Sequence, residues 1–218
     1  IKMGKLNLGI LGGFSGTVGT VVGSTNKNGD DIIRARSKKP RTANSAGQLK
    51  QQTKFGLVIG FMQGVNPVVK TGLKRVAAAE KLSPYNFACR YALNNAVTGT
   101  DAQPVIDYGK VMLSDGELSR DMQAKAVYGA EGVVFSWSEY VPTLVGSAND
   151  TVSMLVYNVS NGELSFSDET VLRSALTSTL ALPYHESGDT LLFYMFFRSA
   201  NDPLDVSTSQ FLGSVVMD

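Results

Sequence analysis

The side chains that do most enzyme and metal chemistry are scarce in this sequence. It contains one cysteine, Cys89, and one histidine, His185. A single cysteine excludes an intrachain disulfide, and so few ligands exclude a metal site built from several Cys or His residues. A Ser-His-Asp or Cys-His arrangement would need His185 as its base. That residue lies in a turn-like segment from Pro183 to Gly188, and we interpret it as a solvated loop residue.

Neighbouring carboxylates at Asp168 and Glu169 are the other candidates for catalysis. Adjacent residues of a strand point to opposite faces, so these two cannot share a substrate. Cys89 falls inside a predicted helix and is expected to pack as a small apolar residue. We therefore expect no enzyme, no cofactor and no metal.

Cations cluster in the first part of the chain. The predicted partner-binding cluster consists of Arg34, Arg36, Lys38, Lys39, Arg41, Lys50 and Lys54. Such a run is typical of a segment that follows phosphates or contacts an acidic protein surface. It is also typical of a solvated strand end, where charge keeps an edge strand from aggregating. Both interpretations stay open.

Glycines recur near the start of the sequence at intervals of mostly three or four. The residues expected to allow close backbone packing or strand addition are Gly9, Gly12, Gly13, Gly16, Gly19 and Gly23. Each interior glycine costs a helix roughly 0.5–1 kcal/mol relative to alanine, so we predict extended chain here. Extended, glycine-rich chain can add to the sheet edge of a neighbour.

The elements of the first hundred residues follow from local signals. Two β-prone runs, 19–24 and 31–36, flank a turn containing Asn28-Gly29, which predicts a hairpin. About three helices should follow. The first begins at Ser45, with Gln48 completing a capping box, and the second spans about 67–81. The third begins at Ser83-Pro84.

After Gln103 the sequence pattern changes from one typical of helices to one typical of strands. Eight strands are predicted near 105–113, 118–128, 131–138, 151–158, 163–172, 176–183, 190–199 and 206–217. Their spacing and alternation favour an antiparallel sandwich. Trp137 closes an alternating strand and is interpreted as a core residue first. A ligand-binding role for it, Tyr140 or Tyr184 in carbohydrate recognition is the weaker alternative.

Charge changes sign at the same place. The 218 residues carry a net charge of +1, but residues 1–103 hold 15 Lys or Arg and 4 Asp or Glu, and residues 104–218 hold 5 and 15. We therefore predict a basic region, 1–103, and an acidic β-sandwich domain, 104–218. Residues 6–26 lack charge, but their glycines and polar residues argue against a membrane span. No secretory signal is evident, which favours a cytoplasmic or virion-associated location.

Two resemblances add to this. The opening residues 3–23, MGKLNLGILGGFSGTVGTVVG, together with Gln48-Leu49 and the run 94–99, NNAVTG, resemble an uncharacterised domain family of Bacteroides-group bacteria. That resemblance implies a bacterial or phage origin and no known activity. In the second half, Trp137 and Tyr157 in successive strands loosely resemble fibronectin type III and immunoglobulin-like domains.

The expected fold class is therefore α+β, with an N-terminal glycine-rich β-hairpin and about three helices before an antiparallel immunoglobulin-like β-sandwich. A non-catalytic structural or assembly protein is the leading hypothesis, because its opposite-charge regions can dock within a chain or between chains. Its partner would be itself or another protein with an acidic surface, as in a phage or surface apparatus. The alternative is a nucleic-acid-binding protein that uses the basic segment 34–54.

Overall fold

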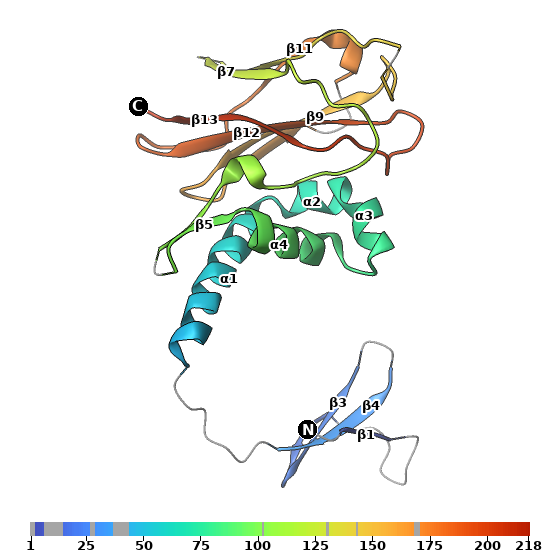
Figure 1. Ribbon diagram of the computed structural model, residues 1–218, viewed down its shortest axis with the longest axis vertical. Coiled ribbons are helices and arrows are strands. Elements are labelled where there is room, and N and C mark those ends of the chain that lie inside the picture. The colour runs from blue at the N-terminus through green and yellow to red at the C-terminus, as the bar shows by residue number, and fades with distance from the viewer. Residues whose placement is uncertain are drawn as a thin grey trace. The chain divides into compact units, whose positions relative to one another are not determined.

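The computed structural model describes residues 3–6, 15–26, 29–36, 44–101, 103–129, 131–142, 144–167 and 171–218 (Figure 1). The chain forms two compact units, Ile1–Ser45 and Ala46–Asp218. This division differs from the boundary predicted near residue 103, because the helices share a hydrophobic core with the strands that follow them. The change from helical to strand texture therefore marks a change of layer inside the second unit.

A four-stranded antiparallel sheet forms the first unit. Its strands are β1 (Met3–Leu6), β2 (Gly16–Val18), β3 (Val21–Thr25) and β4 (Asp31–Ala35), in the order β1-β4-β3-β2. The predicted hairpin is confirmed, since β3 and β4 pair along their whole lengths. The backbone N–H of Asn26 donates to the Asp30 carbonyl oxygen at 2.9 Å and closes the turn. Gly29 has a φ of +82°, which favours glycine.

The helices of the second unit lie in one layer. They are α1 (Ala46–Gly64), α2 (Asn66–Gly72), α3 (Lys74–Ala79) and α4 (Pro84–Asn95). The cap predicted for the last helix is confirmed, because the Ser83 side chain accepts the Asn86 backbone N–H. The helix predicted over 67–81 is instead divided into α2 and α3. The break follows Gly72, a poor helix former that is buried against the Leu113 carbonyl oxygen.

Antiparallel strands make up the rest of the second unit, so the α+β class is confirmed. They are β5 (Val97–Gly99), β6 (Pro104–Ile106), β7 (Lys125–Gly129), β8 (Gly132–Ser136), β9 (Thr151–Asn158), β10 (Leu164–Ser167), β11 (Thr177–Leu180), β12 (Thr190–Arg198) and β13 (Gln210–Val216). Short 3-10 helices lie at η1 (Tyr108–Lys110) and η2 (Arg173–Ala175). The strand predicted over 105–113 is replaced by β6 and η1.

One central sheet, in the order β10-β9-β12-β13, is covered on both faces (Figure 1). A three-stranded sheet, β11-β8-β7, packs on one face, where Phe135 and Trp137 meet Met154 and Phe193. The prediction that Trp137 is a core residue is thereby confirmed.

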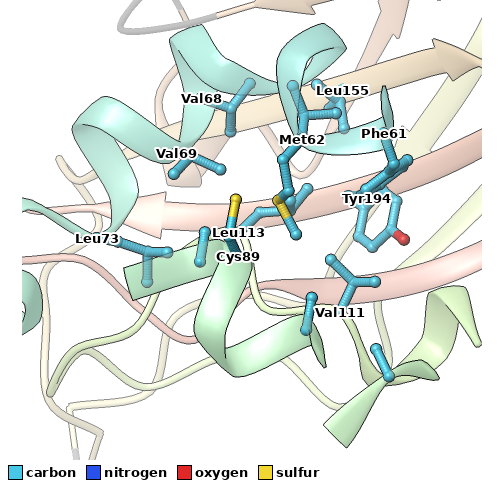
Figure 2. Close-up of a cluster of buried hydrophobic side chains, with 14 of the residues drawn as sticks. Phe61, Met62, Val68, Val69, Leu73, Cys89, Val111, Leu113, Leu155 and Tyr194 are labelled. Carbon is cyan, nitrogen blue, oxygen red and sulfur yellow. The ribbon is translucent and has the colours of Figure 1, made fainter. Parts of the chain in front are cut away.

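The helices cover the opposite face of the central sheet. Figure 2 shows Met62 of α1 beside Leu155 of β9 and Tyr194 of β12. Because both phases of β9 and β12 are apolar, nearly every residue of these strands is buried. The helical layer and the sheets therefore form three stacked layers rather than two adjoining domains.

Candidate functional site

The basic cluster of the first unit lies partly on β4 and just beyond it. Arg34 and Arg36 are two residues apart in extended chain, so both side chains project from one face of the sheet, and both are exposed. Arg34 pairs with Val22 of β3, and the Arg36 backbone N–H donates to the Thr20 carbonyl oxygen. The other predicted cations of this segment, Lys38, Lys39 and Arg41, lie outside the described residues. Two exposed guanidinium groups on one face suit an acidic surface or phosphates.

Lys50 and Lys54 belong to the second unit and have a carboxylate within the chain. They stand one turn apart on α1, and their Nζ atoms lie 2.9 Å from the Oδ2 and Oδ1 atoms of Asp101 respectively. Hydrogen bonds from the two lysines lower the pKa of Asp101 to about 2. These lysines therefore link α1 to the β5–β6 loop. The spacing of residues in the sequence could not reveal this contact.

Three of the predicted glycines fall in the described sheet of the first unit. Gly16 of β2 lies opposite Gly23 of β3, and Gly19 turns the chain between these strands with a φ of +58°. Extended structure is confirmed here. Gly9, Gly12 and Gly13 lie outside the described residues. Among the described strands of this sheet, β2 lies at one edge, and its Val18 is 64% exposed. A further strand could therefore pair with this edge.

The residues weighed for catalysis occupy structural settings. His185 Nδ1 lies 2.9 Å from the carbonyl oxygen of Pro183, in its own loop. Cys89 is buried in α4, and burial raises the pKa of its thiol. Trp137 is also buried and donates from Nε1 to the Arg173 carbonyl oxygen. Within the described ranges, no three His, Cys, Asp or Glu residues are grouped as metal ligands. Asp168 and Glu169 lie outside those ranges.

A groove between α1 and α4 was not predicted. It has a volume of about 440 Å³ and an apolar floor that includes Phe55, Ile59, Cys89 and Leu93. Amide and cationic side chains stand around this floor, among them Lys54 and Arg90. The mixture suits a peptide segment that carries both an apolar side chain and negative charge. The only sequence signal was spacing: positions 51, 55 and 59 on α1, and 86, 90 and 94 on α4, repeat every four residues.

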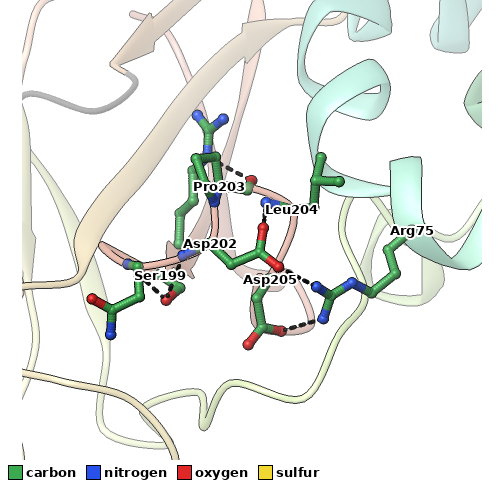
Figure 3. A network of polar contacts seen from close by, with 8 residues as sticks. Arg75, Ser199, Asp202, Pro203, Leu204 and Asp205 are labelled. Carbon is green, nitrogen blue, oxygen red and sulfur yellow. Dashed lines mark hydrogen bonds and ion pairs between the residues drawn. The ribbon is translucent and has the colours of Figure 1, made fainter.

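Arg75 joins the helical layer to the strands electrostatically. Its guanidinium binds Asp202, and its Nη1 lies 3.4 Å from Asp205 Oδ1, both in the β12–β13 loop (Figure 3). Arg90, by contrast, pairs with Glu80 inside the helical layer. The helical layer is therefore held on the sheet mainly by apolar packing. Cationic side chains of the helices remain exposed.

Comparison with known proteins places the chain in a family. A family described as a "Family of unknown function (DUF6266)" matches residues 13–213, so the chain belongs to that family. The match spans most of the first unit and almost all of the second, and it confirms the expectation of an uncharacterised domain family. No curated protein and no solved structure matches the chain. In the described part of the chain, no helix is both long and apolar enough to cross a membrane.

Proposed function

We propose that this chain is a non-catalytic structural or assembly protein whose copies associate through surfaces of opposite charge. The uneven distribution of charge between the units is the observation that carries this proposal. The first unit holds 8 Lys or Arg and 2 Asp or Glu, a net +6, and the second holds 12 and 17, a net −5. Complementary fields of this kind steer association and fix orientation.

Charge is also distributed unevenly within the second unit. Residues 46–103, which include the helical layer, carry 7 Lys or Arg and 2 Asp or Glu, and residues 104–218 carry 5 and 15. Lys70, Lys74 and Lys81 are exposed on the helices. Since the helices dock on the sheet mainly by apolar contacts, much of this charge stays available to a second copy. Two different surfaces of opposite charge favour head-to-tail contacts.

Light scattering after size-exclusion chromatography tests this function. We expect a mass above the 23.3 kDa monomer at low salt, falling toward the monomer as salt rises, because charge attraction is screened within ~10 Å at about 0.1 M salt. The double variant Arg34→Glu, Arg36→Glu should weaken association, and Arg34→Lys, Arg36→Lys is the charge-matched control. A monomer at every concentration and at the lowest salt would overturn the proposal.

Nucleic-acid binding is the second candidate, favoured by the exposed Arg34 and Arg36 on one face of β4. Lys50 and Lys54 share the carboxylate of Asp101, which reduces the net positive charge that this part of α1 offers to phosphates. Fluorescence anisotropy with a random duplex at about 50 mM salt separates the two functions. Binding that weakens steeply with salt would support this candidate, and no binding would remove it.

Three finer inferences belong with this proposal. The two antiparallel sheets that share one core support kinship with immunoglobulin-like or fibronectin type III domains. The glycine-rich opening supports an origin in Bacteroides-group bacteria or their phages. A role in a phage or surface apparatus, with a cytoplasmic or virion-associated location, would suit an assembly protein.

A further inference from the structure

Building on the proposed function, on which it rests, we propose a specific contact between copies. The loop that carries Tyr184 in one copy docks in the α1–α4 groove of the next. The shape and chemistry of the groove, the rigidity of the loop and their complementary charges favour this contact.

The groove runs along two helical stripes. Gln51, Phe55 and Ile59 form the stripe of α1, and Asn86, Arg90 and Asn94 form that of α4. Phe55, one of the apolar residues that line the groove, is 50% exposed and could be covered by a ligand. The amides on both sides offer donors and acceptors to the backbone of an inserted loop.

No carboxylate lines the groove among the described residues, whereas Lys54 and Arg90 do. Both cations are engaged in exposed ion pairs outside it, with Asp101 and Glu80. Exposed pairs are worth little, so exchanging them for ligand carboxylates costs little. Asp101 would keep Lys50 when Lys54 turns to a ligand, because its two oxygens bind different lysines.

Tyr184 presents the matching chemistry. It is 66% exposed, compared with 43% for Tyr128, another exposed tyrosine. Its hydroxyl donates to Glu186 Oε1 at 2.6 Å, which places a carboxylate next to the ring. An aromatic ring with an adjacent negative charge fits an apolar floor bordered by cations.

Hydrogen bonds from the end of β9, from the turn that follows it and within the loop itself hold this loop in place. The carbonyl oxygen of Tyr184 accepts from Asn158 Nδ2 at 3.1 Å and from Asn161 Nδ2 at 2.9 Å. Asp189 Oδ2 accepts the Glu186 backbone N–H at 3.0 Å. An exposed ring on a loop that is already ordered loses little conformational entropy on docking. A second loop with exposed apolar side chains, those of Val141, Leu144 and Val145, has one carboxylate close by in sequence, Glu139.

The groove and the loop are different surfaces, so their contact is heterologous and leads to rings or filaments. Gly188 donates to the Met217 carbonyl oxygen, which places the loop beside the C-terminal end marked in Figure 1. Each open oligomer then has one free groove at one end and one free loop at the other until a ring closes.

Mixing two single-surface variants of the full chain tests this contact by sedimentation velocity at low salt. Tyr184→Ala removes the ring, and Tyr128→Ala is the matched control. Arg90→Ala weakens the groove, and Asn86→Trp, at an exposed helix position, fills it independently. We expect Tyr184→Ala and each groove variant to weaken self-association by about tenfold or more, and Tyr128→Ala to leave it unchanged. A mixture of Tyr184→Ala with Asn86→Trp should form dimers and nothing larger, because each pair retains one intact loop and one intact groove.

Association of the Tyr184 and groove variants at wild-type strength would overturn this contact and leave the proposed function standing. A mixture that stays monomeric would also overturn it. A wild-type chain that is monomeric under all conditions would overturn both.

Discussion

At the scale of single residues, Arg173 is the most deeply buried cation among the described residues of the second unit. It is 1% exposed, and its guanidinium lies 4.0 Å from the centroid of the Phe197 ring. Burial lowers the pKa of this group, and the negative charges of Asp150 and Asp121 oppose that effect. Its Nη1 donates to the Ser119 carbonyl oxygen. Together with the bond from its backbone N–H to the Asp150 carbonyl oxygen, this contact links Arg173 to the segments around Ser119 and Asp150.

Removing this cation should destabilise the fold strongly. Arg173→Ala truncates a fully buried side chain and removes the positive charge near Asp150 and Asp121, and truncation of a large buried side chain costs ~2–5 kcal/mol. Urea unfolding followed by circular dichroism measures the change. Arg120 is exposed, so Arg120→Ala is the control, and its free energy of unfolding should stay within ~0.5 kcal/mol of wild type. Equal stabilities for both variants would contradict the role assigned to Arg173.

A second residue-scale expectation concerns pH. Because Lys54 and Lys50 hold the Asp101 pKa near 2, below its usual 3.8, the stabilisation from this pair is present above pH ~3.8 and is lost as pH falls through about 2. An NMR titration of the Asp101 carboxyl carbon should show this low midpoint. In Lys50→Met, Lys54→Met the midpoint should return toward 3.8. A wild-type midpoint already near 3.8 would show that these ion pairs do not form in solution.

At the scale of elements, α1 forms a helix although it contains glycines, which are poor helix formers, because its C-terminal half is packed in the core. Its C-terminal half buries Val58, Phe61 and Met62, whereas the preceding turns are largely exposed. Gly64 ends the helix against Tyr157, where an added Cβ would lie 2.4 Å from the ring. Gly60, four residues earlier, faces open space.

The two glycines should respond oppositely to alanine. Gly60→Ala should stabilise the protein by ~0.5–1 kcal/mol, because alanine is the better helix former. Gly64→Ala should destabilise it, since the buried Tyr157 ring must move. Thermal unfolding of both variants measures the difference. Stabilisation by both substitutions would mean that α1 does not pack on β9 as described.

The sequence predicted single helices and strands better than it predicted which of them pack against each other. Asn28-Gly29 and Ser83-Pro84 are local signals, and the hairpin and the helix start that they predicted are present. The cover on the second face of β9 was missed, although Leu155 and Tyr157 alternate with Met154 and Val156 and make the strand apolar in both phases. The Asp101 ion pairs and the α1–α4 groove join residues dozens of positions apart, which no local pattern encodes.

At the scale of the whole molecule, helices and strands of the second unit should unfold together. Met62 lies between the helices and the central sheet, and Trp137 lies on the other side of that sheet. Met62→Ala should cost ~2–5 kcal/mol and shift the Trp137 fluorescence transition and the helical circular dichroism transition equally. Separate midpoints for the two probes would instead support the predicted boundary near residue 103.

The charge arrangement acts at this same scale. A net charge of +1 hides a first unit of +6 and a second of −5, and attraction between copies follows from that separation rather than from any single residue.

Sedimentation velocity of the wild-type chain at low and high salt tests the central claim most directly. We expect species larger than the 23.3 kDa monomer at about 20 mM salt, growing with protein concentration, and monomers at about 0.5 M salt. A single monomeric species at both salt concentrations would contradict assembly through opposite charges.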